Sequence, residues 1–124
     1  MQDSKCILVV DDDSHVLFVL RHGLAKLGPE YQILASKNAQ DALDVLDRSY
    51  IALLITDLCL PGMSGVELTE LVREQDPAKP VIWITAHASA QTRNKGRELG
   101  VSGYLEKPLE LNEIREAVRL ALNG

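Results

Sequence analysis

The sequence predicts one α/β domain built on a parallel β-sheet, and three observations point to it. Five short apolar runs are spread along the 124 residues, and most are apolar on both faces, as in strands buried on both sides of a parallel sheet. Amphipathic stretches of helical length separate these runs. The composition, 46% hydrophobic and 25% charged, fits one soluble domain with a sizeable core. We therefore expect residues 1–124 to form a single domain.

The five apolar runs are the predicted strands. Trp83 lies inside the fourth run, where we expect it to pack in the core. Tyr104 begins the short fifth run, where a tyrosine is often only half buried. The predicted strands cover residues 6–10, 33–35, 52–55, 81–84 and 104–105.

Capping and stop signals predict the first three helices. Asp13 or Ser14 caps the first helix, and Gly28-Pro29 stops it. Asn38 caps the second, and the run from Ser64 to Glu67 has the form of a capping box that opens the third. The residues expected to face the sheet from these helices are Leu17, Leu20, Leu24, Leu27, Ala42, Leu43, Leu46, Leu68, Leu71 and Val72.

The last two predicted helices differ in their apolar faces. The fifth carries Leu111, Ile114, Val118 and Leu122 on one stripe. The fourth, between residues 88 and 99, has no strong apolar stripe, and Gly96 in its interior costs about 1 kcal/mol relative to alanine. We expect the fourth helix to be weakly held and mobile.

The alternation of five strands and five helices restricts the topology. Right-handed crossovers favour an open, doubly wound sheet with helices on both faces. For five strands the leading arrangement is the flavodoxin-like three-layer sandwich with parallel strand order 2-1-3-4-5.

Charge and cysteine content exclude several classes of protein. Thirteen Lys and Arg against eighteen Asp and Glu give a formal charge of -5, so we expect no nucleic-acid binding by this segment. No apolar stretch is long enough to span a membrane, and Met1 is followed by polar residues rather than by a signal sequence. Two cysteines, Cys6 and Cys59, are too few for a disulfide scaffold, which indicates a reducing, cytoplasmic setting. The three histidines are scattered and suggest no zinc site.

Polar residues follow the predicted strands where a parallel sheet places its site. In open parallel sheets, that site lies beyond the carboxyl ends of the strands. Three aspartates, 11 to 13, follow the first strand, Asp57 the third, Thr85 the fourth and Lys107 the fifth. Crowded carboxylates need a cation to offset their repulsion, and oxygen ligands suit Mg²⁺. Asp11, Asp12 and Asp57 are therefore the predicted magnesium site.

These residues also carry a resemblance to a known family. The segments 9–13, 56–65, 85–86 and 106–108 resemble, in order and spacing, the receiver domains of response regulators, and the resemblance covers the whole chain. Each segment alone is a weak signal, whereas four together at strand ends are a strong one. Two residues depart from the usual pattern: Ser14 stands where many receivers have proline, and Leu60 where methionine is frequent.

The resemblance implies a role for each site residue. Asp57 would be the nucleophile that takes a phosphoryl group from a phosphohistidine and becomes an acyl phosphate. Asp12 would bind Mg²⁺ directly beside Asp57 and the main-chain carbonyl of Cys59, and Asp11 would hold the ion through water. Lys107 would pair with Asp57 before the reaction and with a phosphoryl oxygen afterwards. The peptide before Pro108 is expected to be cis.

The resemblance also implies a switch. Thr85 would move toward the phosphoryl group and Tyr104 would follow it inward, which reshapes the surface formed by the fourth helix, fifth strand and fifth helix. Packing alone is the competing role for Tyr104. Cys59 and His87 flank the phosphate position, where they would tune its lifetime, although Cys59 is as well explained as a packing residue.

The resemblance also implies partners, and other functions compete with it. The phosphodonor would be a sensor histidine kinase or a phosphotransfer protein, and the switched surface would meet an output domain or a second copy. The chain would be a signalling phosphoacceptor that catalyses its own phosphorylation and dephosphorylation, rather than an enzyme. The main alternative is a receiver-like module regulated by partner contact without phosphorylation. A haloacid-dehalogenase phosphatase would need its nucleophile after the first strand within Asp-x-Asp, followed by Thr or Val at a fixed spacing, whereas Asp13-Ser14-His15 follows here. A flavin carrier would need a phosphate loop in place of three acids.

Overall fold

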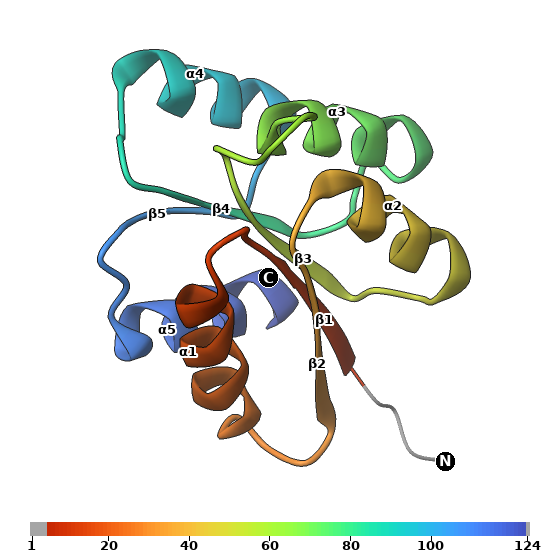
Figure 1. The fold of residues 1–124 in the computed structure, drawn as a ribbon, viewed down its shortest axis with the longest axis vertical. Helices are drawn as coiled ribbons and strands as arrows, with labels where there is room; N and C mark the ends of the chain where they lie inside the picture. Colours follow the sequence, from red (N-terminus) through yellow and green to blue (C-terminus); the bar gives the residue numbers. More distant parts are fainter. Residues whose placement is uncertain (1–4, 124) are drawn as a thin grey trace.

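The computed structural model describes residues 5–123, and its sheet has the predicted topology. Five strands, all parallel, lie in the order β2-β1-β3-β4-β5 (Figure 1). β2 and β5 are therefore the edge strands. The strands are β1 (Lys5–Val10), β2 (Tyr31–Ser36), β3 (Leu53–Asp57), β4 (Val81–Thr85) and β5 (Gly103–Glu106).

Side-chain caps begin the helices where the sequence predicts them. Asp13 caps α1 by accepting a hydrogen bond from the amide of His15, and Asn38 caps α2. Ser64 and Glu67 form the predicted capping box at α3. The helices are α1 (Ser14–Ala25), α2 (Ala39–Arg48), α3 (Gly65–Gln75), α4 (Ala90–Leu99) and α5 (Leu111–Asn123).

The helices cover the sheet in two unequal layers (Figure 1). α1 and α5 pack on one face, where Ile7 and Val9 of β1 belong to the core cluster. α2, α3 and α4 pack on the other face, against Leu8 and Val10. Neighbouring residues of one strand thus enter different cores, because the side chains of a strand alternate between its two faces. This gives the predicted three-layer α/β sandwich.

Some boundaries differ from the prediction. β2 begins at Tyr31 rather than at residue 33, because an edge strand exposes polar residues such as Gln32 and so lacks a continuous apolar run. α1 ends at Ala25, so Leu27 packs against the core from the turn that follows the helix. Within residues 5–123, no helix is both long enough and apolar enough to cross a membrane.

The fourth helix has the weak apolar face that the sequence predicts. Gly96 is its one buried residue among those described. A Cβ at this position would lie 3.1 Å from Val101 Cγ2 and 3.4 Å from the Trp83 ring, so the glycine lets α4 approach the sheet closely. The prediction treated Gly96 only as a cost to the helix, whereas the structure gives it a packing role.

Candidate functional site

The strand ends bring the predicted site residues together at the carboxyl edge of the sheet. Asp11 directly follows β1, Asp57 ends β3, Thr85 ends β4 and Lys107 directly follows β5. β1, β3, β4 and β5 are consecutive in the sheet, so these four residues come from adjacent strands. The predicted cis peptide between Lys107 and Pro108 is confirmed.

Lys107 joins two buried carboxylates. Its Nζ lies 2.9 Å from Asp11 Oδ2 and 3.1 Å from Asp57 Oδ2. The side chains of Asp11 and Asp57 are 0% and 6% exposed, and that of Lys107 is 21% exposed. The resemblance predicts the pair with Asp57, and the pair with Asp11 is an additional contact.

Burial and neighbouring charges shift the pKa values of this group in a consistent way. Burial raises the pKa of Asp11, and the repulsion from Asp57 adds to that effect, although the hydrogen bond from the Asp13 amide and the contact with the Lys107 ammonium oppose it. Burial lowers the pKa of Lys107, but its contacts and charge interactions with Asp11 and Asp57 outweigh this and raise it overall. The lysine therefore remains a cation that both acids stabilise.

One lysine does not neutralise the acids at this edge. Carboxylate oxygens of Asp11, Asp12 and Asp57 all lie within 4.8 Å of one another. Asp11 Oδ1 accepts a hydrogen bond from the Asp13 amide at 2.9 Å, and Asp57 Oδ1 accepts one from the Cys59 amide at 3.2 Å. Asp12 is exposed, which leaves the group open to solvent on one side.

One carboxylate oxygen of this group, Asp11 Oδ2, accepts no hydrogen bond from the residues that the structure describes. It is buried, and its 2.9 Å contact with Lys107 Nζ is an ion pair without the alignment of a hydrogen bond; among residues 5–123 no other donor is hydrogen-bonded to it. Burying a carboxylate oxygen that accepts no hydrogen bond reduces the free energy of unfolding. A divalent cation among the three acids would supply the missing charge, so the residues present fit a magnesium ion.

Glycine at the start of α3 is part of the site's scaffold. A Cβ on Gly65 would lie 2.1 Å from the main-chain oxygen of Asp57, and the Gly65 amide donates to the carbonyl of Leu58 at 3.0 Å. Only glycine permits this approach of α3 to the end of β3. The capping-box pattern includes Gly65 but does not reveal this role, because the contact with Asp57 is not local in sequence.

The remaining predicted residues surround this group. Thr85 is buried, and its hydroxyl accepts a hydrogen bond from the His87 amide at 3.1 Å. Cys59 and His87 are both exposed, and Cys59 is a free thiol.

Tyr104 contacts α4 through Thr92 and Arg93, which no sequence motif marks. Its hydroxyl is hydrogen-bonded to Thr92 Oγ1, and the Arg93 guanidinium carbon lies 4.6 Å from its ring centroid. In the pairing of β5 with β4, Tyr104 lies beside Trp83, and Trp83 precedes Thr85 by two residues on β4. No spacing rule relates Thr92 to Tyr104, because the contact depends on how α4 lies beside the edge strand.

Comparison with known proteins identifies this arrangement. The family model described as "Response regulator receiver domain" matches residues 7–119. Among curated relatives, the sensor histidine kinase RcsC of Escherichia coli (strain K12) is 35% identical over 118 residues, which is 95% of this chain and 12% of the relative. The uncharacterized transcriptional regulatory protein YkoG of Bacillus subtilis (strain 168) is 33% identical over 116 residues, 94% of this chain and 50% of the relative. The chain therefore spans half or less of the length of these relatives.

Solved structures agree with the sequence matches. A CheY-like response regulator receiver domain protein from Methanospirillum hungatei JF-1 superposes with a TM-score of 0.90 at 28% identity, covering 97% of this chain and 94% of that one. The signal receiver domain of an HD domain-containing protein from Pseudomonas fluorescens Pf-5 gives a TM-score of 0.89 at 29% identity, with 97% and 95% coverage. Sequence, fold and site geometry lead to one conclusion: the chain belongs to the response regulator receiver domains of two-component signalling.

Proposed function

We propose that this receiver domain, over residues 1–124, accepts a phosphoryl group on Asp57 from a phosphohistidine. The donor is a sensor histidine kinase or a histidine phosphotransfer protein. An oxygen of the Asp57 carboxylate attacks the phosphorus, the bond from phosphorus to the imidazole nitrogen breaks, and the nitrogen keeps that electron pair. The product is an acyl phosphate on Asp57. Its later hydrolysis returns the carboxylate and releases inorganic phosphate.

The observation that carries the proposal is the position of Lys107 between two buried carboxylates that it cannot fully neutralise. As the phosphoryl group forms its bond, Lys107 can exchange its contact with Asp57 for one with a phosphoryl oxygen. Asp12, Asp57 and the carbonyl of Cys59 would hold Mg²⁺ directly, and Asp11 would hold it through water. The ion would offset the negative charge that the phosphoryl group adds to three acids.

The proposal extends to a switch at the α4–β5–α5 surface. Thr85 would turn its hydroxyl toward the phosphoryl group, and Tyr104 would leave Thr92 and move inward behind it. This is a shift between two states of different population, biased by the phosphoryl group. The reshaped α4–β5–α5 surface would bind an output domain or a second copy of this chain in the cytoplasm. Cys59 and His87 border the phosphate position and would set its lifetime.

Intact mass measurement tests the chemistry directly. The protein is incubated with Mg²⁺ and acetyl phosphate, and we expect the wild type to gain the mass of one base-labile phosphoryl group. Asp57→Asn should gain none, while the matched control Asp47→Asn, on the exposed face of α2, should react as the wild type does. Removal of Mg²⁺ with a chelator should abolish the reaction.

The alternative function is a receiver-like module that responds to partner contact alone. An unmodified wild type, under conditions where another receiver domain is phosphorylated, would favour that alternative. For the flanking positions, exchange of Cys59 and His87 for each other should change the dephosphorylation rate, and an unchanged rate would limit both residues to packing or solvent contact.

A further inference from the structure

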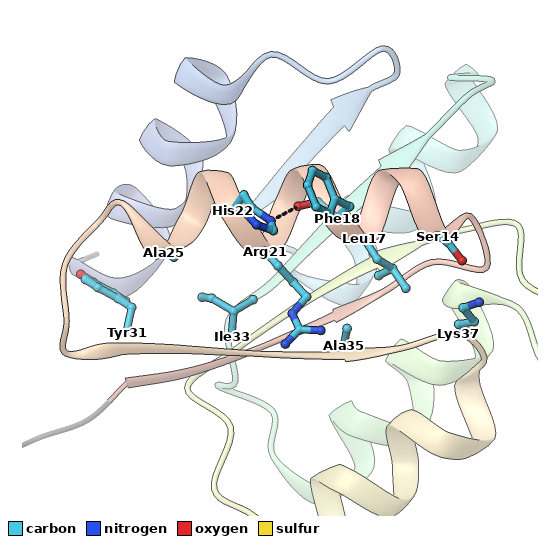
Figure 2. A pocket seen from close by; sticks show the side chains of 10 residues that line it. All are labelled: Ser14, Leu17, Phe18, Arg21, His22, Ala25, Tyr31, Ile33, Ala35 and Lys37. Carbon is cyan, nitrogen blue, oxygen red and sulfur yellow. Dashed lines mark hydrogen bonds between the residues drawn. The ribbon is translucent and has the colours of Figure 1, made fainter.

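A groove runs along the side of α1 that faces away from α5, above the edge strand β2 (Figure 2). Its volume is about 590 Å³. Its floor is formed by Tyr31, Ile33 and Ala35, alternate residues on one face of β2, and α1 forms its wall. The groove begins near Ser14, at the start of α1, and extends to Ala25 at its end.

The groove exists because the helical layer on this face stops at α1. In the parallel register, Ile7 of β1 lies beside Ile33 of β2, and Val9 lies beside Ala35. Ile7 and Val9 are fully buried, whereas Ile33 and Ala35 are only half buried. The outer strand therefore presents apolar side chains that α1 covers on one side only, and there is room beside α1 for another element.

An exposed aromatic ring stands at the rim of the groove. Phe18 is 58% exposed, and its ring centroid lies 4.0 Å from that of His22. His22 Nδ1 donates a hydrogen bond to the carbonyl of Phe18 at 3.0 Å, which holds the imidazole at this position (Figure 2). Exposed aromatic residues beside apolar pockets are typical anchors of protein interfaces.

The charge of the groove is opposite to that of the chain as a whole. The chain has a formal charge of -5, but the groove is lined by Arg21 and Lys37 and by no acidic residue. Across residues 5–123, neither Arg21 nor Lys37 takes part in an ion pair or a side-chain hydrogen bond. Figure 2 shows the Arg21 guanidinium extended from α1 over β2, between Ile33 and Ala35. Two cations without partners thus border an apolar floor.

We propose that this groove binds an amphipathic, acidic helix of a partner protein. The helix would lie beside α1 and complete the layer over β2, with apolar residues on the floor and against Phe18 and carboxylates toward Arg21 and Lys37. α1 has 12 residues, so a partner helix of similar length, about 18 Å, would fill the groove. An anionic membrane surface matches less well, because the negative chain as a whole is repelled from it.

This binding goes beyond the proposed phosphotransfer and does not depend on it. A phosphodonor must reach Asp57 at the carboxyl edge of the sheet. The groove instead lies over the edge strand β2, which β1 separates from β3, so its occupant need not approach Asp57.

The experiment uses a phage-displayed library of 14-residue helical peptides with an apolar stripe and randomised flanks, selected on the whole immobilised protein. We expect enriched peptides to carry Asp and Glu beside the stripe and to shift the amide resonances of α1 and β2. Phe18→Ala should weaken their binding at least about tenfold, and Arg21→Glu combined with Lys37→Glu should do the same. Leu120→Ala, which trims an exposed apolar residue on α5, should leave binding unchanged.

Three results would overturn the proposal. They are a selection that enriches no acidic amphipathic sequence, peptides that bind the groove variants as tightly as the wild type, and resonance shifts outside α1 and β2. Preferential binding of the wild type to phosphatidylserine vesicles, lost in the Arg21→Glu variant, would replace the peptide with a lipid surface. The circular dichroism spectrum and urea midpoint of each variant show whether the fold is intact, which is expected because Phe18, Arg21 and Lys37 are all exposed.

Discussion

The neighbouring helices α3 and α4 cover the same face of the sheet, and each approaches it through a glycine. At Gly65, the first residue of α3, an added Cβ would meet the backbone of Asp57 and Leu58. At Gly96, inside α4, it would meet the side chains of Val101 and Trp83. Backbone cannot yield without moving the strand, whereas side chains can shift by a few tenths of an ångström. The position of α3 is therefore fixed more firmly than that of α4.

The other contacts of α3 and α4 also hold α3 more firmly than α4. α3 buries Leu68, Thr69 and Val72, and Thr69 Oγ1 accepts a 2.9 Å hydrogen bond from the Trp83 indole. The N-terminal half of α4 meets the sheet through Thr92 and Arg93 at Tyr104. The helix that borders the phosphoacceptor is thus rigidly placed, and the helix that adjoins the switch tyrosine is held by contacts that can be exchanged.

Arg73 links the two helices at one end. From α3, its guanidinium donates hydrogen bonds to the carbonyls of Leu99 at 2.6 Å, Gly100 at 3.2 Å and Lys79 at 2.7 Å. Leu99 and Gly100 close the C-terminus of α4, so that end is tied to α3. We infer that any displacement of α4 is greatest at its N-terminus and smallest at Gly100.

The largest effect is expected at Gly65. Gly65→Ala should reduce the free energy of unfolding by about 3 kcal/mol or more, because a Cβ cannot fit 2.1 Å from the Asp57 oxygen. Urea denaturation measures it. The control Gly62→Ala adds a methyl into open space at φ 74°, so only the conformational cost of about 1 kcal/mol is expected there. Equal losses in the two variants would show that the approach to Asp57 does not fix α3.

Loss of the Arg73 contacts should rank second. Arg73→Ala leaves several main-chain carbonyls without their charged donor, and we expect a loss of about 2 to 3 kcal/mol with faster amide exchange at residues 99–102. Arg73→Lys should recover little of it, since an ammonium lacks the planar fork. The control Arg97→Ala, on the exposed face of α4, should change stability by less than about 0.5 kcal/mol. Unaltered exchange at residues 99–102 in Arg73→Ala would contradict the anchored end of α4.

A smaller effect is expected at Gly96. Alanine gains about 1 kcal/mol in helix propensity but overpacks against Val101 and Trp83, which costs roughly 1 to 3 kcal/mol. We expect a net loss of about 1 kcal/mol for Gly96→Ala by urea denaturation. Val101→Ala removes the nearest methyl, so in that background Gly96→Ala should be neutral or stabilising. Stabilisation by Gly96→Ala in the wild-type chain would show that the glycine is only a weakness of the helix.

Gly96 also shows where sequence reasoning reaches its limit. Apolar runs and capping signals are local, and they predicted the five strands, the caps at Asn38 and Ser64 and the parallel order. From the local sequence alone, a glycine inside a helix indicates only a lower helix propensity. Its close approach to Trp83 depends on how the helix lies on the sheet, and the sequence contains no periodic signal for that.

The candidate site was predictable to a similar extent. The rule that polar residues gather beyond the carboxyl ends of parallel strands brought Asp11, Asp57, Thr85 and Lys107 together correctly. It did not reveal that Lys107 lies as close to Asp11 as to Asp57, because that depends on the path of the chain after β5. The contacts of Arg73 with carbonyls 26 and 27 residues away were equally invisible, since carbonyl acceptors have no sequence signature.

A loss similar in size to that at Gly96 is expected at the exchangeable end of α4. Thr92 Oγ1 is hydrogen-bonded to the Tyr104 hydroxyl and also accepts from the amide of Ser89 in the capping box. Thr92→Val keeps the branched shape but removes both contacts, and we expect a loss of about 1 kcal/mol with faster amide exchange at residues 90–93. Thr92→Ser, which keeps the hydroxyl, is the matched control and should behave as the wild type does.

A double-mutant cycle separates the tyrosine contact from the cap. Tyr104→Phe removes only the phenolic hydroxyl, so the coupling free energy between it and Thr92→Val reports the bond from Thr92 to Tyr104. We expect a coupling of about 0.5 to 1 kcal/mol, small because Thr92 is only half buried. Such a value would mean that a phosphoryl group has little to overcome in releasing Tyr104 from α4. A coupling near zero would leave Ser89 as the sole partner of Thr92 and remove Tyr104 from the contacts that hold α4, whereas one above about 2 kcal/mol would make this end as firmly fixed as the end at Arg73.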